Sequence, residues 1–97
     1  MGQFLPKLRA IDVICNFTKE GEIIPLRIRV IDEDGMPQVF TIKEYKDCSH
    51  HGARTMPDGV YVDDRTLIFE CRIVVFDRLR MIRLYLEPDQ LIWRMSG

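Results

Sequence analysis

A thiol and two imidazole rings lie close together in the sequence, at Cys48, His50 and His51. Thiolates and neutral imidazoles are good ligands for zinc and related metals. A structural zinc site usually has four ligands and often opens with paired cysteines, whereas the other thiols, Cys15 and Cys71, fall inside predicted strands. We therefore predict no bound metal, and these three side chains remain the alternative ligand set.

The same cluster has two further interpretations. A nearby imidazole can lower the pKa of a thiol and promote its nucleophilic thiolate form, so Cys48 is also a candidate nucleophile. Adjacent histidines in a long loop are more often solvated, or pack one ring against the domain.

The chain contains no glycine-rich phosphate loop, serine nucleophile elbow or dinucleotide fingerprint. We therefore expect a protein that is not an enzyme and holds no cofactor.

Arginine dominates the basic side chains of the predicted strands. Ten of the 14 basic residues are Arg, and acidic residues gather in predicted turns such as Asp32-Glu33-Asp34. Because successive strand residues point to opposite sides of a sheet, the alternation predicts one outward polar face. Guanidinium groups fork onto phosphates and aromatic rings stack on bases, so this face is a candidate contact surface for single-stranded nucleic acid. Its members are Arg27, Arg29, Lys43, Tyr45, Arg72, Arg83, Tyr85 and Arg94.

Other uses of these surfaces stay open. Outward arginines keep a sheet soluble when their heads pair with Glu44 or Glu70. A basic face also suits an acidic protein partner. Exposed strand edges can pair with another protein or with a second copy of this chain, giving a homo-oligomer. Outer apolar residues could contribute to such contacts, namely Ile68, Val74 and Phe76. A protein-interaction or self-assembly module is therefore the alternative function.

Length and composition exclude several classes of protein. With 97 residues, 46% of them hydrophobic, the chain forms one domain spanning 1–97, with a short loose leader at 1–7. The formal net charge of -1 argues against a general polyanion binder. No apolar run approaches the length of a membrane span, so we expect no membrane contact. Three cysteines at irregular spacing are typical of reduced thiols, which favours a cytoplasmic protein.

Period-two alternation of apolar residues predicts strands throughout the chain. The predicted strands are 8–17, 23–31, 39–45, 60–62, 66–76, 80–86 and 91–95. The long irregular segment 46–59 is a candidate functional loop. Short strands at this spacing predict an all-β domain, a small antiparallel barrel of about six strands in two meanders, SH3-like or similar and partly open. The alternative is a two-layer β-sandwich.

The alternation also predicts which residues fill the core. Trp93 also belongs to the predicted core, because its position in its strand matches the inward faces. The inward sets are Ile11, Val13, Cys15 and Phe17; Leu26, Ile28 and Val30; Phe40 and Ile42; Leu67, Phe69, Cys71, Ile73 and Val75; and Ile82, Leu84 and Leu86.

Three stretches of the chain carry a resemblance to a known group of proteins. They are IRVIDEDG at 28–35, DCSHHG at 47–52 and IWRM at 92–95. Together they resemble a family of small uncharacterised all-β proteins of Gram-positive bacteria, some of which are carried on mobile elements. The resemblance implies a bacterial setting. It brings no activity, ligand or catalytic residue that could be transferred to this chain.

Overall fold

The computed structural model describes residues 8–97, so the predicted leader at 1–7 lies outside the described residues. These residues form eight strands, and among them no helix is long and apolar enough to cross a membrane. The strands are β1 (Arg9–Phe17), β2 (Ile23–Ile31), β3 (Pro37–Asp47), β4 (Arg54–Thr55), β5 (Tyr61–Val62), β6 (Leu67–Val75), β7 (Arg78–Glu87) and β8 (Ile92–Ser96).

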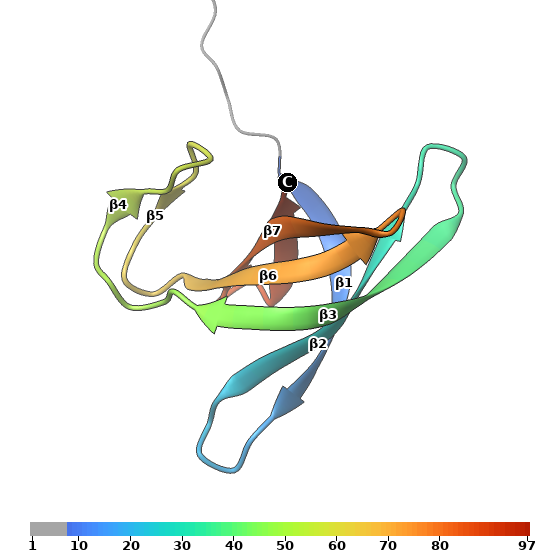
Figure 1. The fold of residues 1–97 in the computed structure, drawn as a ribbon. Helices are drawn as coiled ribbons and strands as arrows, with labels where there is room; N and C mark the ends of the chain where they lie inside the picture. The colour runs from blue at the N-terminus through green and yellow to red at the C-terminus, as the bar shows by residue number, and fades with distance from the viewer. Residues whose placement is uncertain (1–7) are drawn as a thin grey trace, which may run out of the picture.

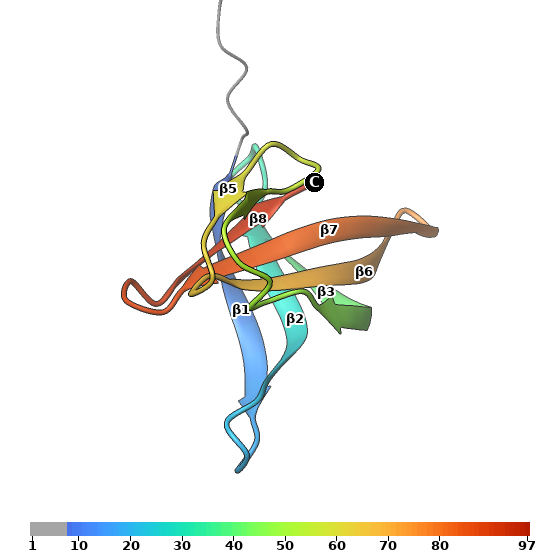
Figure 2. The same cartoon turned by 90° about the vertical axis from the view of Figure 1, so that its left-hand side faces the viewer.

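Six of the strands close into one antiparallel barrel in the order β1-β2-β3-β6-β7-β8 (Figure 1; β8 is labelled in Figure 2). The last strand returns to the first, pairing from Arg9 opposite Met95 to Ile11 opposite Trp93. The remaining strands, β4 and β5, form a separate two-stranded sheet within the connection from β3 to β6 (Figure 1). The predicted small antiparallel barrel is confirmed, and the strands do not separate into the two layers of a sandwich.

Alternating apolar side chains fill the barrel. The inward sets predicted for β6 and β7 are confirmed, because these side chains are buried or packed against the core. Trp93 is half-buried, and its ring lies 5.9 Å from that of Phe69. The central cluster consists of Ile28, Val30, Phe69, Cys71, Ile73, Ile82, Leu84 and Met95.

A bulge in β2 makes one predicted core position wrong. Cys15 pairs with Pro25 whereas Ile14 pairs with Arg27, so Leu26 has no partner on β1. An extra residue in one strand shifts the alternation of side chains beyond it. Leu26 is therefore exposed, and Pro25 is buried in its place. Phe17 is also exposed, at 68%, because it lies at the end of β1.

A second apolar cluster lies outside the barrel. Met56, Val60 and Val62 from the connection between β3 and β6 pack against Ile68 and Tyr85 on the outer face of the barrel. Ile68 is therefore fully buried rather than exposed as expected. The connection is folded and not an irregular loop, and a hydrogen-bonded turn joins β4 to β5, where the Met56 N–H donates to the Val60 carbonyl at 2.8 Å.

Two leucines on β7 test the assignment of the core. We expect Leu84→Ala to lower the free energy of unfolding by about 2–5 kcal/mol, because it leaves a cavity among close-packed side chains. The matched control Leu79→Ala should change it by about 0.5 kcal/mol or less, because this side chain is 57% exposed. Urea unfolding of both variants measures the difference. Equal losses would contradict the core described here.

Candidate functional site

Ion pairs between neighbouring strands balance the predicted basic face. Three arginines of this face lie directly opposite carboxylates in the strand register, and cross-strand pairs of opposite charge attract each other. Arg29 Nε donates to Asp12 Oδ2 at 3.0 Å, and Arg83 Nη2 donates to Glu70 Oε2 at 2.9 Å. Arg72 Nε lies 3.4 Å from Glu44 Oε2. These guanidinium groups therefore already have carboxylate partners within the fold.

The two tyrosines do not lie on an open outer face, which corrects the sequence interpretation. Tyr85 points outward but is only 4% exposed, because the connection carrying β4 and β5 covers it. A bulge at Lys43 shifts the alternation of β3, so Tyr45 lies opposite the buried Cys71. The Tyr45 ring packs edge-on against Phe69, with 6.3 Å between ring centroids, and the residue stays 43% exposed. No pair of stacked aromatic platforms results from these two residues.

The other members of the predicted face are dispersed. Arg27 and Lys43 are exposed, and neither takes part in an ion pair among residues 8–97. Arg94 is half-buried and donates to Gln90 Oε1 at 3.1 Å. The eight predicted residues therefore include two exposed cations free of carboxylate partners, and the structure does not gather all eight on one surface.

Asp58 fastens the outer connection to the barrel. Its Oδ2 accepts hydrogen bonds from Tyr85 Oη at 2.7 Å and from the Ser96 hydroxyl, and Arg83 Nη1 lies 3.9 Å away. Burial opposes ionisation of this carboxyl group, but the hydrogen bonds from Ser96, Tyr85 and the Val60 N–H outweigh it and lower the pKa of Asp58. Burial and then Asp58 itself raise the pKa of Tyr85. Because the connection covers these side chains, we assign them a structural role, which is to hold the connection against the barrel.

The side chains of Cys48, His50 and His51 do not converge on one point. Cys48 Sγ packs toward the outer apolar cluster and lies 3.7 Å from the Lys46 carbonyl oxygen, whereas His50 Nδ1 lies 2.9 Å from the carbonyl oxygen of Asp64. His51 is exposed. Between residues 8 and 97 no group of three His, Cys, Asp or Glu side chains is placed to hold a metal ion.

The environment of Cys48 does not activate its thiol. Burial, followed by the negative charge of Glu70, raises the pKa of Cys48. Burial and then Cys48 raise the pKa of Cys71 to about 12. The neutral thiol is the weaker nucleophile and the weaker metal ligand.

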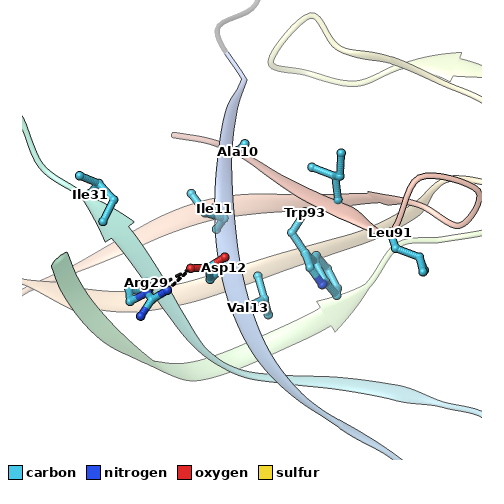
Figure 3. A pocket seen from close by; sticks show the side chains of 9 residues that line it. Ala10, Ile11, Asp12, Val13, Arg29, Ile31, Leu91 and Trp93 are labelled. Atoms are coloured by element: carbon cyan, nitrogen blue, oxygen red, sulfur yellow. Dashed lines mark hydrogen bonds and ion pairs between the residues drawn. The ribbon is translucent and has the colours of Figure 1, made fainter. Parts of the chain in front are cut away.

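A seam in the barrel wall is the site that sequence reasoning missed. Pairing of β1 with β8 ends at Ile11 and Trp93, so beyond this point the β8 side of β1 has no neighbouring strand within the described chain. Leu91 lies in the turn between β7 and β8 with a φ of 55°, and its N–H donates to the Glu87 carbonyl at 3.1 Å. Figure 3 shows Leu91 and Trp93 on one side of β1, with Arg29 and Ile31 on the other.

Two hollows meet along this seam, and both are lined by Leu91 and Trp93. The hollow drawn in Figure 3 has a volume of about 480 Å³ and includes the Arg29–Asp12 ion pair. The other, which we call the β1 groove, has a volume of about 370 Å³ and only apolar or thiol-bearing lining residues. They are Cys15, Phe17, Ile23, Leu67, Leu86, Pro88, Leu91 and Trp93.

Acid should weaken the contact made by Asp58. Because its pKa is lowered by folding, this carboxylate stabilises the fold above its ordinary pKa, and the contribution is lost as the pH falls through the folded value. We expect Asp58→Asn to cost about 1.5–3 kcal/mol near neutral pH and much less near about pH 2. Urea unfolding across this range measures the effect, with the exposed Glu20→Gln as control. A cost independent of pH would contradict this role.

Alkylation rates test the state of the thiols. We expect Cys48 to react with iodoacetamide at neutral pH more slowly than free cysteine, because its raised pKa keeps it protonated. The buried Cys71 should not react in the folded protein. Mass spectrometry of proteolytic fragments at successive times assigns each rate. A Cys48 that reacts faster than free cysteine would restore it as a candidate nucleophile.

Comparisons with protein-family models, with curated proteins and with solved structures found no match to this chain. The resemblance to small all-β proteins of Gram-positive bacteria therefore stays a prediction.

Proposed function

We propose that this protein is a non-enzymatic binding module that takes up an extended segment of a partner protein as an additional strand along β1. The unpaired side of β1 is the observation behind this proposal. Residues 13–17 have strand partners on the β2 side only, and the open side borders the apolar β1 groove. A peptide that adds to an exposed sheet edge gains affinity from main-chain hydrogen bonds and specificity from pockets for alternate side chains.

The direction of the backbone groups supports strand addition. The Thr18 N–H donates to the Glu22 carbonyl at 2.9 Å, so the backbone of Thr18 faces β2. Main-chain groups of successive residues alternate between the two sides of a strand. Cys15 and Phe17 therefore direct their N–H and carbonyl groups toward the open side. A guest strand would meet unpaired donors and acceptors there.

The open edge also lacks the features that usually prevent strand pairing. Natural sheets protect free edges with charged residues, proline or very short strands. Residues 13–17 read VICNF, without charge and without proline. Phe17 is 68% exposed and Leu91 77%, so apolar surface lies at both margins of the groove. A guest with apolar residues at alternate positions would cover this surface, because every second side chain enters the groove.

Protein binding is better supported by the geometry than nucleic-acid binding. Arg29, Arg72 and Arg83 already have carboxylate partners. Tyr85 is covered by the connection, so Tyr45, at 43% exposure, is the one accessible ring of the two. Binding of an extended, apolar segment needs none of these groups. The cytoplasm is the compartment that we propose, because three free thiols suit a reducing environment.

Selection from a random heptapeptide phage library tests the proposal. We expect enriched peptides with apolar residues at alternate positions, and synthetic fluorescent copies should bind the protein in an anisotropy titration. Cys15→Pro removes one N–H from the open edge without removing a bond to β2, and should raise the Kd at least about tenfold. Phe17→Lys places a charge beside the groove and should have a similar effect.

Matched controls keep this experiment interpretable. Cys15→Val retains the N–H, and Val74→Lys adds a charge to an exposed strand position away from the groove, so neither should change the Kd. A labelled single-stranded oligonucleotide in the same assay tests the competing prediction, since nucleic-acid binding falls steeply with salt. The proposal fails if no peptide is enriched over a blank surface, or if folded Cys15→Pro and Phe17→Lys bind as well as the wild type.

A further inference from the structure

The turn between β6 and β7 holds an aromatic residue that the fold does not use. Val75 pairs with Arg78, and the two residues between them, Phe76 and Asp77, have φ values of 49° and 63°. Successive positive φ values mark a type I′ turn, which favours Asn, Asp or Gly. For an aromatic residue this conformation is strained, and Phe76 is 95% exposed, so packing within the chain does not offset the strain.

Phe76 lies at the rim of a cavity in one end of the barrel. The cavity has a volume of about 320 Å³. Polar side chains at its rim include Arg9, Asp32, Gln38 and Arg80, which come from both sides of the opening. Its apolar lining consists of Ile28, Val30, Phe40, Ile73, Val75, Ile82 and Met95. Apolar side chains of the barrel thus line a hollow at this end.

The two sides of this opening carry opposite charge. The β6–β7 hairpin supplies Arg78 and Arg80, which we call the basic lip, and its turn also carries Asp77, so this side has a net charge of about +1. The turn between β2 and β3 supplies the acidic lip, Asp32-Glu33-Asp34, of which Asp32 lines the cavity. Arg9 lies beside it, with Nη2 donating to the Ile31 carbonyl at 2.8 Å, so the net charge of this side is about -2. Of the five side chains of the two lips, none forms an ion pair with another described residue.

Hydrogen bonds fix the Asp32 carboxylate of the acidic lip in position. Asp32 Oδ1 accepts hydrogen bonds from the N–H groups of Met36 at 2.8 Å and Asp34 at 2.9 Å, and Oδ2 accepts one from Gln38 at 3.1 Å. The bond from Met36 contributes most to lowering the pKa of Asp32. The hairpin turns also expose Met36 on the acidic side and Leu79 on the basic side.

We propose that two copies of this chain associate face to face at this opening, with the basic lip of each copy against the acidic lip of the other. A two-fold axis through the opening brings both pairs of lips together, as a self-complementary interface requires. Phe76 of each copy then covers the apolar opening of the other. The acidic lip disfavours a polyanion and the basic lip disfavours a polycation, so a surface of mixed charge is the partner that fits.

Charge-reversed variants test this dimer by sedimentation velocity over a wide range of protein concentrations. The wild type should shift from the mass of one chain to that of two, and added salt should weaken the association. The double variant Arg78→Glu/Arg80→Glu should lose it, and so should Glu33→Lys/Asp34→Lys. An equimolar mixture of these two variants should restore a dimer, because acidic lips then face basic lips throughout.

A substitution at the turn provides a second readout. Phe76→Asn suits a type I′ turn, so it should raise the urea midpoint while weakening association. A wild type that stays monomeric at all concentrations, or a variant mixture that fails to dimerise, would overturn the dimer. Association abolished by Phe17→Lys but not by charge reversal would assign it to the open edge of β1 instead. Peptide binding at the β1 groove does not depend on any of these outcomes.

Discussion

The short pairing between β1 and β8 is the constraint on which the rest of the structure depends. Three residue pairs, from Arg9 opposite Met95 to Ile11 opposite Trp93, close a barrel whose other strand pairs are longer. This contact encloses the central apolar cluster, because it brings Met95 over the core. It also ends early enough to leave the second half of β1 open on one side. The register between β1 and β8 therefore determines both the closure of the barrel and the length of β1 that stays open to a guest strand.

The outer face of the barrel is divided between covered and open regions. The connection carrying β4 and β5 covers Ile68 and Tyr85, and Asp58 fixes it there through Tyr85, Ser96 and Arg83. On the barrel strands, Arg72 forms an ion pair with Glu44, and Arg83 forms one with Glu70. What stays open is apolar at the seam and of mixed charge at the barrel end. These two surfaces differ in chemistry, which is why we assign them different partners.

Much of this fold could be predicted from the amino-acid sequence, because alternation over long strands is a strong signal. The inward sets of β6 and β7 are correct, since these strands pair over nine consecutive positions without a bulge. Leu26 and Tyr45 were misassigned because a bulge changes the side-chain direction without changing the residue pattern. β4 has two residues, too few to show alternation. The seam was missed because it depends on where pairing between β1 and β8 stops, which alternation does not encode.

Closure of the barrel makes the fold independent of which strand comes first along the chain. Because β1 and β8 are neighbours, the six barrel strands form a ring in which each strand pairs with two others, and no position in the ring is structurally first. A covalent link from β8 to β1 would need to cross only the distance between adjacent strands, about 5 Å. The fold is therefore a natural candidate for circular permutation, with new ends placed at the exposed turn between β6 and β7.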